Sequence, residues 1–249
     1  MHTRTATALL TGISSGLGYG LAAELLGRGW EVYGCSRRPG HPQGAVHRRI
    51  DITDYASLPA ELDRLTAAAT QLDLVVLNAG ILGGIRDLCD TPMEEAKRVM
   101  ETNLWANKAI MDWLCRSVRS VAQIVMISSG ASVLGNRGWS GYSLSKAALN
   151  MLARLYSHEF PDTHICALAP GIVDTAMMGY LCGEEADAAR YPALQRLRDA
   201  RGTAAMPTPA LTARQVVEVL PRLRERPSGD FIDIRELLDP ERYASLYKK

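Results

Sequence analysis

Three side chains in the second half of the chain are suited to moving a proton onto or off a carbonyl oxygen. Tyr142 and Lys146 are four residues apart in a helical pattern, so they would share one helix face. An ammonium group beside a tyrosine lowers the pKa of its hydroxyl, which can then act as a general acid or base. Ser129 follows an apolar run and could hydrogen-bond the substrate oxygen. We therefore predict hydride chemistry on a C=O or CH–OH group.

Asn103 is a fourth candidate catalytic residue. It lies within a long helical pattern over residues 94–116, which we predict as one helix or two segments. Its apolar neighbours include Leu104 and Ile110, and a polar amide in such surroundings needs a partner or a function. We expect Asn103 to hold a water molecule that connects Lys146 to solvent.

A glycine-rich turn comes directly after the first apolar run of the chain. Gly12, Gly16 and Gly18 permit a tight turn and close backbone approach to a pyrophosphate. The helix that follows would present free N–H groups and the positive end of its dipole. The candidate cofactor-binding residues of this turn are Gly12, Ser14, Ser15, Gly16, Leu17 and Gly18.

Two other interpretations of this turn stay open. Gly12, Ser14 and Gly16 also fit G-x-S-x-G, the nucleophile elbow of serine hydrolases. Gly18 has no role in such an elbow, which favours the nucleotide-binding interpretation. A structural turn that binds no ligand is the remaining alternative.

The residues after the second predicted strand indicate the cofactor. An NAD site usually has an acidic residue about 20 positions after the glycines, which binds the ribose 2′-hydroxyl. Here the strand ends in Cys35, Ser36, Arg37 and Arg38, with no Asp or Glu among them. Arg37 offers a planar cation and Ser36 a hydroxyl for a 2′-phosphate, so we predict NADP(H). A solvent-exposed arginine pair without a ligand is the alternative.

Asp51 and Ile52, after the third predicted strand, are further candidates for the cofactor site. Asp51 could meet the adenine amino group, or it could cap a helix predicted to begin near Thr53. Both roles stay open.

Short apolar runs alternate with helical patterns along the chain. The predicted strands cover residues 6–10, 31–35, 45–50, 72–77, 122–127, 163–168 and 231–234. The predicted helices cover residues 17–26, 53–70, 94–116, 142–160 and 212–223, the last with Thr212 as its N-cap. Continuous apolar strands between helices are typical of a parallel sheet covered on both faces. We predict an α/β fold: a single doubly wound Rossmann-type domain over residues 1–249, with about seven strands and ligands at their carboxyl ends.

The composition fits this fold and indicates which kinds of binding partner are not expected. The 249 residues are 47% hydrophobic, enough for a sizeable core. The formal net charge is +1, which predicts no binding to nucleic acid or to a membrane surface. The five cysteines, an odd number without metal-ligand spacing, predict reduced thiols in a cytoplasmic protein and no metal site. No apolar run reaches the length of a membrane span.

Together and in this order, the motifs closely resemble the short-chain dehydrogenase/reductase family over nearly the whole chain. The residues that carry the resemblance are Thr11, Gly12, Gly16, Gly18, Asn78, Ala79, Gly80, Asn103, Ser129, Tyr142, Lys146, Pro170, Gly171 and Thr175. The resemblance implies a catalytic tetrad and a bound nicotinamide cofactor. The members of the implied tetrad are Asn103, Ser129, Tyr142 and Lys146.

The resemblance also implies further cofactor contacts. Asn78, Ala79 and Gly80 would flank the cofactor, and Tyr142 and Lys146 would contact it as well. Pro170 and Gly171 precede Ile172, whose backbone would meet the carboxamide, as would the hydroxyl of Thr175. The segment 170–177 resembles the sepiapterin and benzil reductase-like branch of carbonyl reductases, which hints at flat, conjugated dicarbonyl substrates.

Residues 176–210 are expected to form a lid over the nicotinamide. The predicted substrate pocket is apolar and consists of Leu134, Trp139, Met177, Met178 and Tyr180. The methionines could instead pack within the lid. No charged residue is expected in the pocket, which favours a small, mostly apolar ketone, diketone or secondary alcohol over a sugar phosphate. The alternative function is a catalytically silent NADP-binding regulator or scaffold of the same fold.

The two long predicted helices carry apolar residues on more than one face. These residues are Met100, Leu104, Ile110, Trp113, Leu149, Leu152 and Leu155. Apolar surface beyond what one sheet face needs predicts burial against a second copy of the chain. The family resemblance likewise implies a homodimer or homotetramer.

Overall fold

Seven parallel strands form the central sheet of the structure, a computed structural model that describes residues 4–117, 120–183 and 187–247. The strands are β1 (Thr7–Thr11), β2 (Glu31–Ser36), β3 (Val46–Arg49), β4 (Leu72–Leu77), β5 (Val121–Ile127), β6 (His164–Ala169) and β7 (Phe231–Asp233). Their order across the sheet is β3-β2-β1-β4-β5-β6-β7, and every neighbouring pair is parallel. The predicted Rossmann-type architecture is confirmed.

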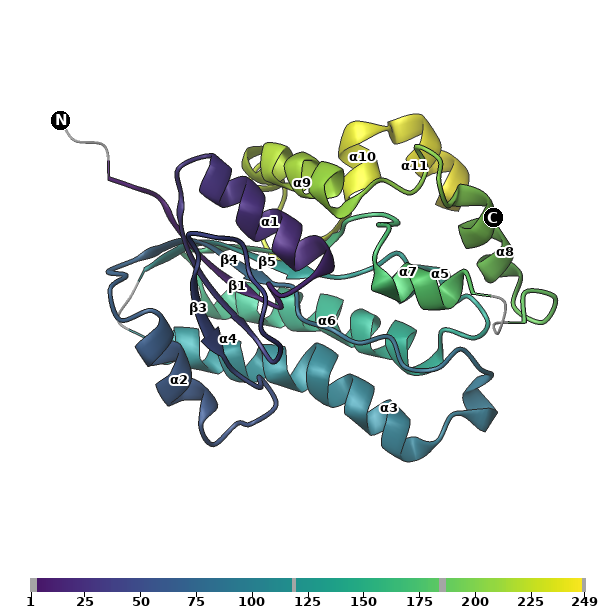
Figure 1. Ribbon diagram of the computed structural model, residues 1–249, viewed down its shortest axis with the longest axis horizontal. Coiled ribbons are helices and arrows are strands. Elements are labelled where there is room, and N and C mark those ends of the chain that lie inside the picture. The colour runs from purple at the N-terminus through teal and green to yellow at the C-terminus, as the bar shows by residue number, and fades with distance from the viewer. Residues whose placement is uncertain (1–3, 118–119, 184–186, 248–249) are drawn as a thin grey trace.

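Helices cover both faces of this sheet (Figure 1). One face carries α1 (Gly16–Gly27) and α9 (Pro209–Leu223), and the other carries α2 (Leu58–Leu65), α4 (Ala106–Arg116) and α6 (Ser140–Glu159). Successive residues of a strand point to opposite faces, so Leu9 packs in the core beneath α4 and α6, whereas Leu10 packs beneath α1 and α9. Both side chains are fully buried. Burial on both faces explains why the strands are continuous apolar runs.

The chain changes direction across the sheet between β1 and β4. After β1 it builds outward to β3, and β4 then returns to the other side of β1. Leu9 therefore has two register partners, Tyr33 on β2 and Val75 on β4. At such a reversal the loops after the two strands diverge and leave a crevice at the carboxyl end of the sheet, where ligands bind in open α/β folds.

The helix predicted over residues 53–70 is much shorter in the structure, because polar side chains at its start make competing bonds. α2 spans Leu58–Leu65. Asp51 accepts hydrogen bonds from the backbone N–H of Thr53 at 3.0 Å and from its hydroxyl at 2.8 Å. Asp54 accepts one from the hydroxyl of Ser57 at 2.6 Å. Local bonds of this kind stabilise turns at the expense of helix.

The N-cap of the last predicted helix is Thr208, so the prediction of Thr212 was wrong. α9 starts at Pro209, whose fixed φ suits the first helical position. The hydroxyl oxygen of Thr208 accepts a hydrogen bond from the N–H of Leu211 at 3.3 Å. Thr212 lies within the helix and is fully buried against the sheet.

The helix predicted over residues 94–116 consists of two helices separated by a π-helical turn. α3 (Met93–Met100) and α4 flank the turn Glu101–Trp105, which contains Asn103. The side chain of Asn107 donates a hydrogen bond to the backbone carbonyl of Asn103 at 2.8 Å. Single π turns inside helices frequently mark functional sites. Here the turn carries one of the predicted catalytic residues.

Several short helices were not predicted from the sequence. They are η1 (Leu88–Asp90), α5 (Ala131–Leu134), α7 (Ala176–Leu181), α8 (Pro192–Ala200), α10 (Ile234–Leu238) and α11 (Pro240–Tyr247). α7 and α8 belong to the segment predicted as a lid, and they share an apolar cluster with the loop before α6 through Leu181, Leu194 and Trp139. Within the described ranges, no helix is both long and apolar enough to cross a membrane.

Gly18 in α1 lies so close to the glycine turn that a larger residue does not fit. A Cβ at this position would be 2.3 Å from the carbonyl oxygen of Gly12 and 2.4 Å from Nδ2 of Asn78. We expect Gly18→Ala to lower the free energy of unfolding by about 1–3 kcal/mol, measured by urea denaturation. Gly27→Ala is the control, because nothing lies within 4 Å of a Cβ there. Equal stabilities of the two variants would contradict the expected clash.

Candidate active site

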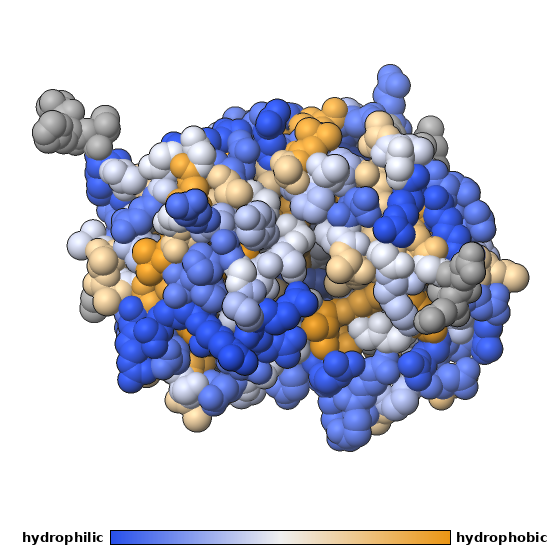
Figure 2. All heavy atoms as spheres, viewed as in Figure 1, coloured by the Kyte–Doolittle hydropathy of each residue, from blue (hydrophilic) through white to orange (hydrophobic). Residues whose placement is uncertain are grey.

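All the predicted site residues except Asn103 and Tyr180 line one cleft of about 970 Å³ at the carboxyl ends of the strands. The predicted cofactor-binding residues that line it are Gly12, Ser14, Ser15, Gly16, Leu17, Gly18, Ser36, Arg37, Asp51, Ile52, Asn78, Ala79, Gly80, Tyr142, Lys146, Pro170, Gly171, Ile172 and Thr175. Ser129 lines it as well. Figure 2 shows one face of the molecule with apolar surface in a hollow right of its centre and hydrophilic residues around the hollow.

The loops after β1 and β4 are fastened to each other at the floor of the cleft. The hydroxyl oxygen of Thr11 accepts hydrogen bonds from the N–H groups of Asn78 and Ala79, both at 3.0 Å. The side-chain amide of Asn78 donates to the carbonyl oxygens of Thr11 at 3.0 Å and Gly12 at 3.4 Å. These bonds hold the glycine turn with its φ angles of 77° at Gly12 and 57° at Gly16. The N-terminus of α1 consequently opens onto the cleft.

Two arginines line the cleft beyond the glycine turn. Arg38 donates a hydrogen bond to the hydroxyl of Ser15 at 3.0 Å, and Arg37 is exposed nearby. The hydroxyl of Ser36 is already engaged, since it donates to the carbonyl of Arg38 at 2.8 Å and lies 2.8 Å from Nε2 of His47. Arg38 was not predicted as a cofactor-binding residue, although it follows β2 directly after Arg37 and no acidic residue lies beside it.

Asp51 lines the cleft but does not cap a helix, because α2 begins at Leu58. Burial alone would raise the pKa of Asp51. The hydrogen bonds from Thr53 and the charge of Arg37 outweigh burial and lower this pKa. Asp51 is therefore an anion that caps a turn, and its predicted contact with adenine stays a prediction.

Ser129, Tyr142 and Lys146 meet beside the carboxyl end of β5. Ser129 follows this strand, and its hydroxyl oxygen accepts a hydrogen bond from the N–H of Ala131 at 3.1 Å. Tyr142 and Lys146 come from the first two turns of α6. Burial raises the pKa of Tyr142, and its hydrogen bond with Ser129 offsets part of that rise. The three side chains that were predicted to act together are therefore neighbours in the structure.

Lys146 is a buried cation. Its side chain is 4% exposed, and its Nζ donates a hydrogen bond to the carbonyl oxygen of Ile127 at 2.7 Å. The same Nζ lies 5.8 Å from the centre of the Tyr142 ring. Burial lowers the pKa of Lys146 to about 8. The ammonium group thus lies next to the proton donor that it is predicted to assist.

Asn103 lies behind the cleft rather than in its lining, as far as the described residues go. Its Oδ1 accepts a hydrogen bond from the N–H of Ile81 at 2.8 Å, and its Nδ2 donates to the carbonyl of Ile81 and to the hydroxyl of Ser145, both at 2.9 Å. A Cβ on Gly80 would lie 3.2 Å from this Oδ1 and 3.6 Å from Nζ of Lys146. Asn103 therefore fixes the loop after β4 against α6, and the predicted water relay stays a prediction.

A series of hydrogen-bonded polar side chains that supports Ser129 was not predicted from the sequence. Ser128 donates a hydrogen bond to Oδ1 of Asn150 at 2.5 Å, and Nδ2 of Asn150 donates to the hydroxyl of Ser132 at 2.9 Å. Ser132 in turn donates to the carbonyl of Ser129 at 2.6 Å. The signal was present in the sequence, because Asn150 follows Tyr142 by two helical turns on the same face of α6.

Four of the five residues predicted for the substrate pocket line the cleft. Tyr180 does not line it, and one charged residue that was not expected does. Leu134, Trp139, Met177 and Met178 line the cleft. Tyr180 lies outside the described lining and is 48% exposed, because α7 turns its other side toward the cleft. The expectation of no charged side chain was also wrong. Arg196 from α8 lines the cleft and donates a hydrogen bond to Oδ1 of Asn136 at 3.2 Å.

Comparisons with known proteins agree with this site. A model of the short chain dehydrogenase family matches residues 6–185. A benzil reductase ((S)-benzoin forming) of Saccharomyces cerevisiae is 34% identical over 189 residues, which cover 68% of this chain and 72% of that protein. One of Bacillus subtilis is 26% identical over 244 residues, 92% and 98% of the two chains. The crystal structure of the KRED1-Pglu enzyme has a TM-score of 0.79 at 24% identity and covers 92% of this chain and 100% of its own.

The chain belongs to the short-chain dehydrogenase family. It is an oxidoreductase of the class that acts on C=O and CH–OH groups. The family resemblance inferred from the sequence motifs, including the relation to benzil reductases, is thereby confirmed.

The lowered pKa of Lys146 gives the stability of the protein a pH dependence that can be isolated. An unfolded lysine titrates near pH 10.4, whereas the folded one titrates at about 8. Between these values the unfolded chain binds more protons, so stability gains from rising pH. Lys146→Met removes this term. We expect the free energy of unfolding of the unmodified protein to rise relative to that of Lys146→Met between about pH 7.5 and 9.5 in urea denaturation. A constant difference would contradict the assigned burial.

Proposed function

We propose that this protein is an NADPH-dependent reductase of small, mostly apolar ketones or diketones, which also catalyses the reverse oxidation of secondary alcohols. One observation carries the proposal. A single cleft is lined by the arginines after β2, by Ser129, Tyr142 and Lys146, and by apolar side chains of the lid. A catalytically silent regulator of the same fold would not require the three catalytic side chains to converge on such a cleft.

The residues of this chain suit a dinucleotide that carries a 2′-phosphate. Glycine at positions 12, 16 and 18 suits close approach of a pyrophosphate to the N-terminus of α1. A Cβ on Gly18 would collide with the carbonyl oxygen of Gly12 and so disturb the turn that holds this N-terminus open. Arg37 and Arg38 supply cations after β2, where an acidic residue would repel a phosphate. Bound NADPH supplies the hydride.

Tyr142 is the proposed general acid in the reduction. Burial keeps its hydroxyl protonated, so it can give a proton to the substrate oxygen as negative charge develops there. Ser129 accepts from the backbone of Ala131, and its hydrogen bond with Tyr142 places its hydroxyl where it can orient the same oxygen. The nearby charge of Lys146 stabilises the tyrosinate that remains. Asn103 is proposed to hold the water that returns a proton to this group.

The lining of the lid side suits an apolar carbonyl compound. The relatives described above are reductases of benzil by name, and benzil is a flat diketone. Leu134, Trp139 and the two methionines provide an apolar surface that adapts to such a shape. Arg196 adds one cation, so a substrate with a polar substituent at one end is included in the proposal.

We also propose that the protein works as a homodimer or homotetramer. Most apolar residues that suggested this in the sequence belong to the core of the subunit: Leu104, Ile110, Trp113 and Leu149 are buried there. Only Leu155 of the original residues belongs to the exposed apolar set on which the proposal rests. Trp105, Leu144, Met151 and Leu155 are exposed, and the last three lie on one face of α6.

The cytoplasm is the proposed location. The thiols of Cys35, Cys89, Cys115, Cys166 and Cys182 are free. Free thiols at exposed positions such as Cys89 and Cys115 favour a reducing compartment.

Cofactor preference is tested by reversing the charge at Arg37. A hydrogen bond to a charged group contributes about 1.5–3 kcal/mol, so Arg37→Asp should raise the Kd of NADPH at least tenfold. The Kd of NADH should change much less. Arg222→Asp, an equal change of net charge on the outer surface of α9, should leave both constants in place. Equal Kd values for NADPH and NADH in the unmodified protein would refute the preference.

The proton donor is tested by removing one hydroxyl. Tyr142→Phe keeps the ring for packing but deletes the general acid, so kcat should fall by about 10²–10⁴-fold on a diketone such as benzil. The Kd of NADPH should remain, because the hydroxyl faces the substrate. Tyr180→Phe removes a hydroxyl outside the cleft and should retain full activity. Near-normal turnover by Tyr142→Phe would assign the proton to another group.

Assembly is tested on the exposed face of α6. We expect light scattering to give a dimer or tetramer at micromolar concentration, and Met151→Glu with Leu155→Arg to shift the protein toward monomer. Leu211→Glu, which removes an exposed leucine of α9, should leave the mass unchanged. A monomeric unmodified protein would rule the assembly out.

A further inference from the structure

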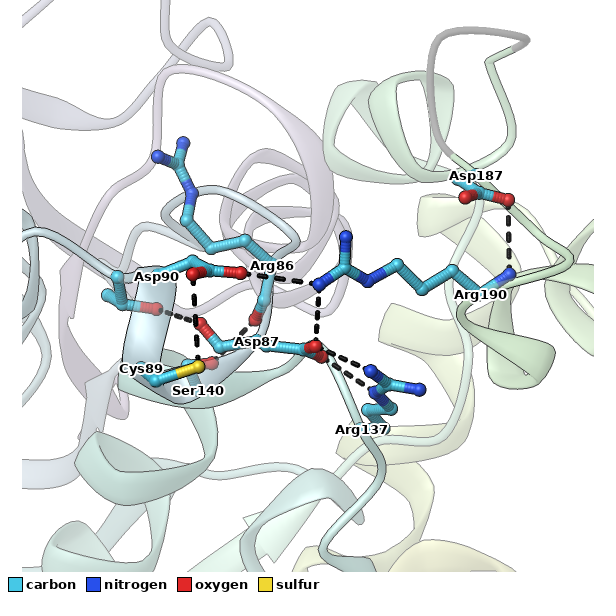
Figure 3. Close-up of polar contacts among 9 residues, drawn as sticks. Arg86, Asp87, Cys89, Asp90, Arg137, Ser140, Asp187 and Arg190 are labelled. Atoms are coloured by element: carbon cyan, nitrogen blue, oxygen red, sulfur yellow. Dashed lines mark hydrogen bonds and ion pairs between the residues drawn. The ribbon is translucent and has the colours of Figure 1, made fainter.

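An ion-pair cluster joins three distant segments of the chain beside the lid (Figure 3). The carboxylate of Asp87 accepts hydrogen bonds from Arg137 at 2.7 and 2.5 Å and from Arg190 at 2.8 Å. Both guanidinium groups also lie over the ring of Tyr191, with the carbon atoms 5.9 and 5.7 Å from its centre. We refer to Asp87, Arg137, Arg190 and Tyr191 as the clasp.

The four members of the clasp come from three segments of the chain. Asp87 lies in the loop after β4, just before η1, and Arg137 lies in the loop between α5 and α6. Arg190 and Tyr191 belong to the lid segment, defined here as residues 187–200. In Figure 3 Arg190 approaches the carboxylate of Asp87 from above and Arg137 approaches it from the lower right. The clasp therefore ties the lid segment to two loops that are fixed to the sheet.

The geometry of the clasp differs from that of an isolated surface ion pair, although Arg137 and Arg190 are about half exposed. Isolated exposed pairs contribute little, but bidentate arginine–carboxylate geometry and networks are the exceptions. The carboxylate of Asp87 is 15% exposed and is bonded by both arginines. Hydrogen bonds from Arg137 and then from Arg190 hold the pKa of Asp87 far below its usual range. The clasp consequently stays charged at any ordinary assay pH, and salt rather than pH should weaken it.

The clasp is packed directly onto the wall of the substrate side of the cleft. Tyr191 is 6% exposed and belongs to the apolar cluster that contains Trp139 and Leu181, both of which line the cleft. A Cβ on Gly138 would be 2.8 Å from the Tyr191 ring, so the ring lies flush against the loop before α6. Displacing the lid segment would therefore open this wall.

The loop of Asp87 is itself anchored to the start of the catalytic helix. The N–H of Arg86 donates a hydrogen bond to the carbonyl of Gly138 at 3.3 Å, and the hydroxyl of Ser140 donates to the carbonyl of Arg86 at 2.8 Å. Ser140 is the first residue of α6, which carries Tyr142. These bonds thus fix the position of the lid segment relative to Tyr142, the proposed proton donor.

We propose that Asp87 is a positioning residue whose charge latches the lid segment over the substrate side of the cleft. The inference rests on the proposed function for the identity of that side. Without the carboxylate charge of Asp87, Arg137 loses its bidentate partner and Arg190 keeps only its longer contact of 3.3 Å with Asp90, so the repulsion between the two guanidinium groups favours separation. The closed form then becomes a minor population, and apparent substrate affinity falls by that fraction. Chemistry in the closed form is unchanged, so the loss falls on KM rather than on kcat.

Asp87→Asn is the test, with Asp90→Asn as the matched control. Asp90 is 57% exposed and lies 3.3 Å from Arg190, so it loses the same charge on the same loop with little effect on the latch. With NADPH and benzil, KM for benzil should rise at least about tenfold in Asp87→Asn while kcat does not fall. It should change less than about twofold in Asp90→Asn. The Kd of NADPH should be unaffected in both variants.

Two further measurements distinguish loss of the clasp from a general loss of stability of the fold. Salt at about 1 M should raise KM of the unmodified protein toward that of Asp87→Asn and leave the variant nearly unchanged. Amide hydrogen exchange of residues 187–200 should speed up in Asp87→Asn while exchange in the sheet stays slow. This readout needs no substrate, so it tests the latch even if the protein does not reduce benzil.

Three results would overturn the latch. One is unchanged exchange in residues 187–200 of Asp87→Asn. Another is a KM for benzil that is insensitive both to salt and to Asp87→Asn. The third is a parallel loss of kcat, of NADPH binding and of protection in the sheet, which would make Asp87 a fold-stabilising residue instead.

Discussion

The buried ammonium group of Lys146 is the constraint on which the site depends. An isolated charge in the interior is strongly unfavourable unless polar groups surround it. Its hydrogen bond to the carbonyl of Ile127 requires α6 to cross the carboxyl end of β5 at this point. A Cβ on Gly80 would lie 3.6 Å from this Nζ, so the loop after β4 packs directly beside the cation. One cation thus fixes the relative positions of α6, the carboxyl end of β5 and the loop after β4.

Polar contacts spread from this point through the neighbouring elements. Asn103 bonds both backbone groups of Ile81 and the hydroxyl of Ser145, which joins the π turn to the loop after β4 and to α6. On the other side of α6, Asn150 connects Ser128 to Ser132. Because each buried polar group in these chains has a partner, the catalytic side chains are held in position before any ligand binds.

The sequence predicted the sheet and the cofactor side of the cleft because both follow from local patterns. Continuous apolar runs define buried parallel strands, and polar residues directly after them must gather at one edge. Ser129 was predicted in this way, whereas Tyr142 and Lys146 were predicted from their four-residue spacing on one helix face. The helix over residues 53–70 was predicted too long, because Asp51 and Asp54 bond locally in a way that apolar spacing does not register.

The lid side was predicted less well because packing between distant segments determines it. Periodicity gave no reason to turn Tyr180 outward while Met177 and Met178 turn toward the cleft. It likewise could not distinguish core from surface on the long helices, where Ile110 and Leu149 are buried in the subunit and Met151 is exposed. The clasp joins residues 50 and 103 positions apart, a separation at which no sequence spacing indicates contact.

The two ends of the cleft are therefore stabilised by different kinds of interaction, and this difference has a functional consequence. The cofactor side is held by backbone hydrogen bonds and close glycine contacts such as those of Thr11 and Gly18, which have no alternative arrangement at low cost. The lid side is held by a small apolar cluster and by charged groups near water. Solvent can replace ion pairs at the surface, which is why we propose that the lid segment separates from its loops without disturbing the sheet. A site that must keep its cofactor geometry and still exchange substrate needs this combination of a rigid side and a releasable one.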